Sequence, residues 1–266
     1  MYAIQNNTQE SRSKRETATR ERSWLAAGPY WLWLVNAMSL LVLGGWILLE
    51  ADGGASWNAL VAWRMADPAG EMSHAGAARA SPNACFLMAW LLSVGGLSLA
   101  IAWGTILVGP RGYRNLRCWL ATITLTGAWL GFFVNVQELV WSGYRYRLQT
   151  ALPHCMTATG RLQADWPRRD GEREPWGPYM AYPIARPTML MLMTTPEISP
   201  GIRASSIERS HAGGVRLELA GEEQGVWLEW HPPGELPDSF LGGLEDPHTL
   251  RRWSALGDGW FVVKYQ

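Results

Sequence analysis

An apolar segment from Ala84 to Val108 constrains the fold more than any other feature of the sequence. It runs for 25 residues without a charged side chain. A helix of about 20 apolar residues is long enough to span the hydrocarbon core of a bilayer. A buried helix of a water-soluble domain does not need so long an apolar stretch. We therefore predict a membrane-spanning helix over residues 84–108.

Two further segments have the same character. Residues 30–49 are almost wholly apolar, and residues 118–141 begin with 17 uncharged residues. The chain has 17 tryptophans, many at the ends of the apolar segments, where the amphipathic indole prefers the headgroup layer. These patterns predict a three-helix membrane region over residues 30–143, preceded by a disordered polar tail over residues 1–29.

The first apolar segment has an alternative interpretation as a cleaved signal peptide, because a basic tail precedes it. Signal peptides have apolar cores of about 7–15 residues, which is shorter than residues 30–49. We therefore favour an uncleaved first span.

Lysine and arginine residues in the short flanking segments predict the orientation of the spans. Eight of them lie in the tail and in the link between the second and third spans, against four in the other flanks. We expect a multi-pass protein of the cell (inner) membrane with a cytoplasmic N-terminus. Three crossings then place residues 144–266 outside the cytoplasm.

Residues 144–266 have the pattern of β-strands. Apolar and polar residues alternate in Val215–Leu219 and in Val226–Trp230, which predicts a hairpin with one buried face. Gly257–Gly259 separates two more apolar runs, and Thr188–Thr195 suits a buried strand. The predicted fold class is three transmembrane helices followed by a mainly antiparallel β domain, α+β overall.

Small residues recur at four-residue spacing within two of the spans. Such stripes let helix backbones approach closely, although glycine is common in membrane spans for other reasons. We expect at least one stripe to lie in a helix–helix contact, within the chain or between copies. The residues are Gly96, Ala100 and Gly104 on the second span, and Gly127 and Gly131 on the third.

Asn36 and Glu138 are the polar candidates within the spans. Asn36 is expected to hydrogen-bond a neighbouring helix. Glu138 is the only acidic residue in any predicted span, so a proton or cation site is one interpretation. Its position near the outer end of the third span favours an ordinary interfacial charge.

The three cysteines are too few for a disulfide framework and lack zinc-site spacing. In the predicted topology Cys85 and Cys155 both face an oxidising compartment, where a disulfide between them could form. We favour the alternative of two free thiols. Cys118 is expected to remain reduced at the cytoplasmic side.

Charge and motifs exclude several classes of function. The formal net charge is zero, so nucleic-acid binding is disfavoured. The sequence has no nucleotide-binding loop, no nucleophile elbow and no metalloprotease motif. Its histidines lack the spacing of metal ligands, so we expect no cofactor.

The leading hypothesis is a non-enzymatic membrane anchor whose extracytoplasmic β-rich domain binds a protein partner or forms a homo-oligomer. One alternative is a membrane-tethered enzyme with a site around His154, His211 or His231. Another is a small transporter or channel subunit that uses Glu138.

Overall fold

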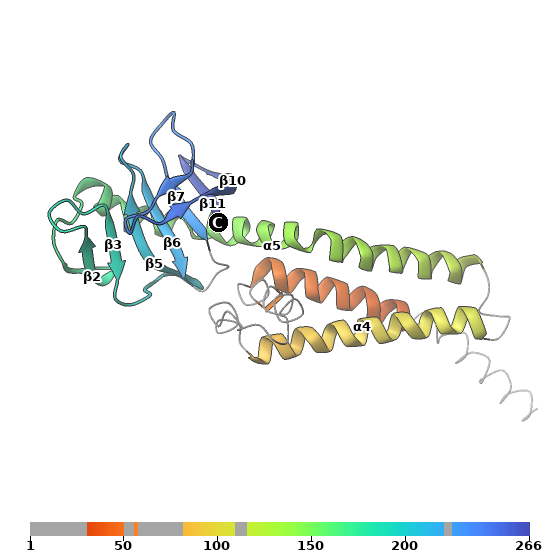
Figure 1. The fold of residues 1–266 in the computed structure, drawn as a ribbon. Helices are drawn as coiled ribbons and strands as arrows, with labels where there is room; N and C mark the ends of the chain where they lie inside the picture. The colour runs from red at the N-terminus through yellow and green to blue at the C-terminus, as the bar shows by residue number, and fades with distance from the viewer. Residues whose placement is uncertain (1–30, 51–55, 58–81, 110–115, 221–224) are drawn as a thin grey trace, which may run out of the picture. The chain divides into compact units, whose positions relative to one another are not determined.

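The computed structural model describes residues 31–50, 56–57, 82–109, 116–220 and 225–266. These residues form two compact units. Of the described residues, the helical unit contains those up to Gly44 and those within Ala89–Val136, whereas the second unit contains those within Gly45–Met88 and Gln137–Gln266. All the strands belong to the second unit (Figure 1). The predicted disordered tail lies outside the described residues.

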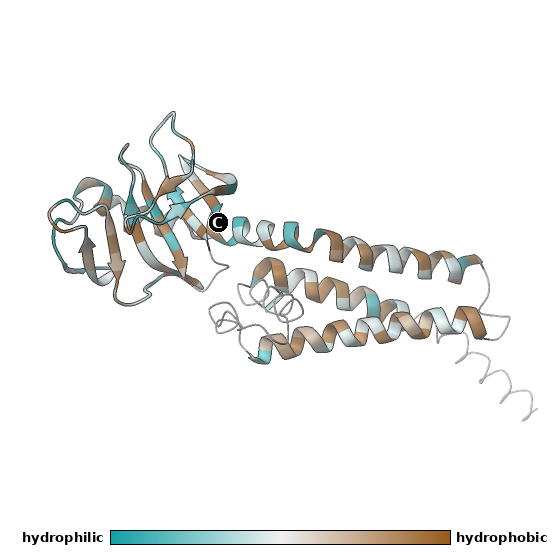
Figure 2. Ribbon diagram, viewed as in Figure 1, coloured by the Kyte–Doolittle hydropathy of each residue, from teal (hydrophilic) through white to brown (hydrophobic). Residues whose placement is uncertain are grey.

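Three long helices carry the apolar segments. They are Trp31–Leu49, α4 (Pro82–Val108) and α5 (Leu116–Ala164), with 19, 27 and 49 residues. Each is long and apolar enough to cross a membrane, and apolar residues are prominent along all three (Figure 2). The predicted spans are thus confirmed as helices, which indicates a membrane protein.

One stripe of each helix is buried within the helical unit. The buried positions recur mainly at intervals of three, four or seven residues, as in packed helix bundles. They are Asn36, Ser39 and Leu43 on the first helix, Gly95, Ser98, Ala102 and Ile106 on α4, and Cys118, Thr122, Trp129 and Val136 on α5. The outer faces carry exposed apolar side chains such as Leu41, Leu97 and Leu130, which suits a lipid environment.

Helix α5 continues well beyond the predicted end of the third span at residue 141. It runs to Ala164 with Pro153 inside it, so residues 144–164 are helical rather than the start of the β region. The third apolar segment is apolar on all sides. Residues 144–164, in contrast, form an amphipathic helix, because their apolar residues recur on one face only. These buried residues are Tyr144, Leu148, Ala151, Leu152, Cys155, Ala158 and Leu162.

The second unit is built on a nine-stranded antiparallel sheet. Its strand order is β1-β2-β3-β5-β6-β7-β11-β10, with β4 paired to β5, and β8 and β9 form a separate small hairpin. The strands are β1 (Gly171–Arg173), β2 (Gly177–Tyr182), β3 (Met189–Leu192), β4 (Glu197–Ser199), β5 (Ile202–Arg209), β6 (Val215–Ala220), β7 (Val226–Trp230), β8 (Phe240–Leu241), β9 (Pro247–His248), β10 (Leu250–Gly257) and β11 (Trp260–Tyr265). The predicted fold class is confirmed.

The predicted hairpins and the buried strand are present. Strands β6 and β7 pair antiparallel, with Val215 opposite Trp230. Strands β10 and β11 pair on either side of the turn at Asp258, which has a positive φ of 51° and is flanked by glycines that tolerate such a turn. Strand β3 lies within the predicted segment Thr188–Thr195.

One face of the sheet is apolar and is covered by α5. Five residues in register across β3, β5, β6, β7 and β11 are each fully buried, and residues directly opposite each other share a face. They are Leu190, Ile207, Leu217, Leu228 and Val262. The next residue in this row, Ser254 of β10, accepts a 3.1 Å hydrogen bond from Nε1 of Trp141 on α5.

Candidate functional site

The opposite face of the sheet carries a row of buried charges. Glu208 on β5, Arg216 on β6 and Glu229 on β7 are consecutive register partners, so their side chains lie side by side on this face. They are only 5%, 6% and 0% exposed. Charged residues are seldom so deeply buried unless they are paired, so this row is the most unusual chemical feature of the domain.

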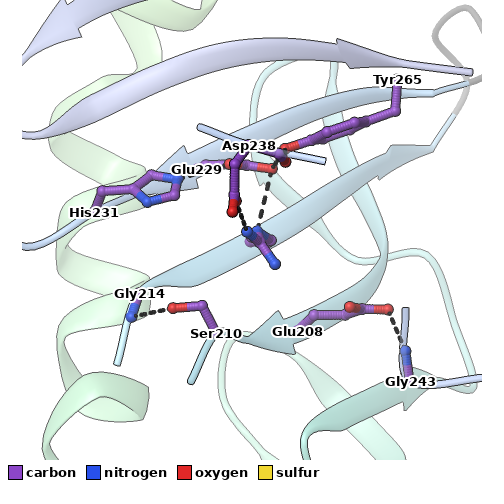
Figure 3. A network of polar contacts seen from close by, with 9 residues as sticks. Glu208, Ser210, Gly214, Glu229, His231, Asp238, Gly243 and Tyr265 are labelled. Atoms are coloured by element: carbon purple, nitrogen blue, oxygen red, sulfur yellow. Dashed lines mark hydrogen bonds and ion pairs between the residues drawn. The ribbon is translucent and has the colours of Figure 1, made fainter. Parts of the chain in front are cut away.

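Glu229 is the centre of the network. One carboxylate oxygen accepts a hydrogen bond of 2.7 Å from the Tyr265 hydroxyl, and the other lies 2.7 Å from Nε2 of His231. Nε of Arg216 is 3.5 Å from the first oxygen. Figure 3 shows Glu229 between His231 and the hydroxyl of Tyr265.

Arg216 connects this network to the segment that follows β7. Its guanidinium forms a 3.0 Å ion pair with Asp238 and lies 3.8 Å from the ring centre of Phe240. The Tyr265 hydroxyl also donates a 3.2 Å hydrogen bond to the backbone oxygen of Asp238. Residues after His231 therefore close over the charged face of the sheet.

Burial changes the acid–base behaviour of two groups here. Desolvation and then the adjacent Glu229 carboxylate raise the pKa of Tyr265 well above its ordinary range, so its hydroxyl remains a hydrogen-bond donor. Desolvation likewise raises the pKa of the Glu208 carboxyl from 4.5 to about 7. Glu208 accepts a 3.1 Å hydrogen bond from the backbone nitrogen of Gly243.

The chemistry of the network is that of a buried structural cluster. Glu229 contacts both His231 and Tyr265, and all three residues are at most 3% exposed, so these side chains do not face a substrate from solvent. A buried charge that is paired and hydrogen-bonded holds a particular arrangement of strands, because leaving either partner alone is costly. The network thus positions the segment after β7 on the sheet.

Sequence reasoning missed this cluster, since the alternation in β6 and β7 predicted only one buried face. The available signal was opposite charge at Arg216 and Glu229, which the predicted hairpin brings opposite each other. His231, two residues after Glu229, was a second signal. The alternation in β6 and β7 could not show that the residues after His231 cover Arg216 and Glu229 and exclude water from them.

The three histidines considered as enzyme residues lie in different settings. His154 on α5 and His211 in the turn after β5 are exposed, whereas His231 is buried against Glu229. Within the described ranges, no group of three His, Cys, Asp or Glu side chains is suited to hold a metal ion. The geometry thus gives no support to a shared catalytic or metal centre among them.

Asn36 joins all three helices of the helical unit. Its amide nitrogen donates a 2.6 Å hydrogen bond to the Ser98 hydroxyl on α4, and its amide oxygen accepts a 2.9 Å bond from Nε1 of Trp129 on α5. The Trp129 indole in turn lies directly against Gly95 of α4. A polar group buried among helices in this way gives the packing a specific register.

The predicted small-residue stripes lie beside the packed surface rather than in it. Gly96, Gly104, Gly127 and Gly131 have no atom of the described structure within 4 Å of where a Cβ would stand, and Ala100 is exposed. Contacts of these stripes with another copy of the chain remain a proposal. The close contact between helices lies at Gly95, one residue before Gly96, where the Trp129 ring packs against α4.

Glu138 is held by an arginine of the β-rich domain. Its two carboxylate oxygens lie 2.8 and 2.6 Å from the guanidinium nitrogens of Arg252 on β10. The same guanidinium lies 4.8 Å from the ring centre of Trp141. Both side chains of the ion pair are substantially exposed, so the pair orients β10 on α5 and adds little stability.

All three cysteines are free thiols in the structure. Cys85 is partly buried and Cys118 is buried, whereas Cys155 on α5 is completely inaccessible. No disulfide therefore joins Cys85 to Cys155 in this structure. Cys155 instead fills part of the buried face of α5.

Comparisons with known proteins assign no relative. The chain matches no family model, and neither a curated protein nor a solved structure is significantly similar to it.

Proposed function

We propose that this chain is a membrane anchor that presents its β-rich domain to another protein, either a distinct partner or further copies of the chain. The observation that carries the proposal is the continuity of α5. This helix contains the third apolar segment, and its second half is also a structural element of the β-rich domain. The same helix thus contains the third apolar segment and residues of the β-rich domain.

The contacts at the junction support this role. Trp141 and Glu138 of α5 bind Ser254 and Arg252 of β10, at the end of the third apolar segment. Tryptophan and paired charges are typical of the membrane–water interface.

The β-rich domain also exposes apolar side chains that its own core does not use. Met180 and Tyr182 project from one face of β2, Ile184 in the following loop is 92% exposed, and Met193 follows β3. Exposed apolar groups in one region favour contact with a protein, and methionine adapts to irregular partner surfaces. We infer that this region, residues 180–193, is where the partner binds.

Neither alternative from the sequence gains similar support. The buried setting of His231 and the separate, exposed settings of His154 and His211 do not favour an enzyme. A proton or cation path through Glu138 is disfavoured because Arg252 already neutralises this carboxylate. The anchor hypothesis predicts no ion flux through the purified protein in liposomes.

Reporter fusions test the predicted orientation. A reporter that is active only outside the cytoplasm should be active when fused after Gln266 and silent when fused after Gly109, because the predicted topology places these positions on opposite sides. Activity in intact cells, normalised to the amount of fusion protein in the membrane, is the measurement. The reverse pattern would contradict the proposed localisation of the domain.

Site-specific photo-crosslinking tests the proposed partner surface. A photoreactive residue at Ile184 should form a discrete adduct in native membranes, identified by mass spectrometry as a second copy or as one defined protein. The matched position is Arg203, which is exposed on β5 and should give no such adduct. Tyr182→Asp should abolish the Ile184 adduct, because it places a charge in the apolar region. Equal adducts from both positions would contradict the proposal.

A further inference from the structure

The segment Pro232–Thr249, hereafter the cap segment, covers the charged face of the sheet. It follows β7, contains the small β8–β9 hairpin and leads into β10. Phe240 and His248 of this segment stack on each other with ring centres 4.7 Å apart. Both also contact the rings of Trp227 and Tyr265 on the sheet. The cap segment is therefore held by aromatic contacts as well as by the Asp238–Arg216 ion pair.

A second attachment of the cap segment is at Gly243. Its backbone nitrogen donates to the buried carboxyl of Glu208, and a Cβ on Gly243 would stand 2.6 Å from Cβ of Met189. Glycine thus allows the cap backbone to approach the sheet this closely. Glu208, Met189 and Arg216 share this face of the sheet.

Glu208 differs from Glu229 in its charge environment. Among the described residues, no cation lies within ion-pair distance of Glu208, and the Gly243 amide is its hydrogen-bond donor. Arg216, its neighbour on β6, is already engaged by Glu229 and Asp238. The charges of Asp246 on the cap segment and Glu218 on β6 disfavour an ionised Glu208, whereas Arg216 and the Gly243 amide favour it. Burial is the largest effect and favours the protonated carboxyl.

We propose that the protonation state of Glu208 controls whether the cap segment stays closed on the sheet. The protonated carboxyl allows the cap to pack against β5 and β3. Loss of the proton creates a buried charge without an ion pair of its own, and this charge is relieved when the cap segment moves away and water reaches the carboxylate. Opening uncovers the cluster of Trp227, Phe261, Val263 and Tyr265, together with the partly buried Phe240 and Leu250.

The raised pKa of Glu208 determines how the opening of the cap segment depends on pH. Burial in the closed state raises its pKa from 4.5 to about 7, whereas an open cap exposes the carboxyl to water. A raised carboxyl pKa stabilises the closed state fully below pH 4.5, and this contribution is lost as the pH rises through about 7. The ratio of open to closed cap should therefore rise roughly 30-fold between pH 5.5 and 8.5.

Two histidines also contact carboxylates near the cap segment. His248 lies 2.8 Å from Asp246, and His231 lies 2.7 Å from Glu229. Both are contacts other than the one between Glu208 and Gly243. The Glu208→Gln variant separates the contributions, because it removes the titrating carboxyl and leaves both histidine pairs in place.

Hydrogen exchange of the full-length protein in detergent measures the opening. Mass spectrometry would follow peptides of the cap segment at pH 5.5 to 8.5, corrected for the intrinsic pH dependence of exchange. Between pH 5.5 and 8.5, the protection of the cap amides from exchange should fall by roughly 30-fold in the wild type. It should stay constant in Glu208→Gln. Peptides of β6 and β7 should keep their protection in both proteins.

The control variant is Glu172→Gln, which changes an exposed carboxylate on β1 and should behave as the wild type. A cap whose protection does not change with pH would overturn the proposal. The same holds if protection falls equally in the wild type and in Glu208→Gln, because Glu208 would then not be the group that controls the opening.

Discussion

Glu229→Ala is expected to destabilise the β-rich domain by about 3–5 kcal/mol, the usual effect of removing one partner from a buried ion pair. The substitution removes the inner carboxylate from the buried Arg216 and from the Tyr265 hydroxyl, so both then depend on Asp238. His231 loses its carboxylate contact at the same time. Water cannot replace the missing carboxylate unless the domain opens, because the site is buried.

Cys155 offers a direct measurement of this effect. Its thiol is completely buried, so in a chain carrying Cys85→Ser and Cys118→Ser a maleimide reacts only when the domain opens. If opening and closing are fast relative to the labelling reaction, the labelling rate follows the open population. The expected loss of stability corresponds to a rate increase of roughly 150- to 5,000-fold for Glu229→Ala.

The control for the buried network is an exposed ion pair. Asp165 pairs with Arg173 at 2.8 Å, and the Asp165 side chain is 80% exposed. Asp165→Ala should raise the Cys155 labelling rate by less than about five-fold, because exposed pairs contribute little. If Glu229→Ala labels no faster than Asp165→Ala, the buried network is not what holds the domain together.

The second large effect is expected at Gly95 in the helical unit. A Cβ at this position would clash with the Trp129 ring, whose Cη2 would be only 2.7 Å away. The indole cannot move freely, because its Nε1 donates to Asn36 and its ring stacks on Phe133. Gly95→Ala should therefore destabilise the packed helices by about 1–3 kcal/mol, as overpacked cores usually do.

Gly96→Ala is a closely matched control. It lies on the same helix, one residue further along, and nothing stands within 4 Å of its added Cβ. Both substitutions change helix propensity by the same amount, so their difference isolates the clash with Trp129. The measurement is the SDS concentration at which the full-length protein unfolds in mixed micelles, followed by tryptophan fluorescence.

A double-mutant cycle completes this test. In a Trp129→Leu background the large ring is absent, so Gly95→Ala should have little additional effect. Equal midpoints for Gly95→Ala and Gly96→Ala in the otherwise unchanged chain would contradict the packing described for the three helices. A lower midpoint for Gly96→Ala than for Gly95→Ala would favour the predicted stripe containing Gly96 as the contact.

The candidate site was only partly accessible from the sequence. Asn36 was identified because any polar side chain in an apolar span needs a hydrogen-bond partner, but the pattern could not say that the partners are Ser98 and Trp129. Glu138 was placed at an interface, yet its partner Arg252 is 114 residues away in the chain. Such distant partners are selected by the folded structure.

The length of the apolar runs and the period of the apolar pattern determined the secondary structure of most of the predicted elements. Apolar runs long enough to cross a bilayer specify helices, since lipid offers no partner for the backbone polar groups. Alternation with period two specifies strands with a buried face. The hairpin of β6 and β7 and the strands either side of Asp258 followed from local residues for the same reason.

Only the tertiary structure decided which polar residues are buried and which helix face is packed. Glu208 and Glu229 look like solvated strand residues until the cap segment covers them, and the contact at Gly95 rather than Gly96 depends on where Trp129 arrives from another helix. The second half of α5 is a helix with one buried face because the sheet covers it. Burial arises from segments distant in sequence, so local patterns do not contain it.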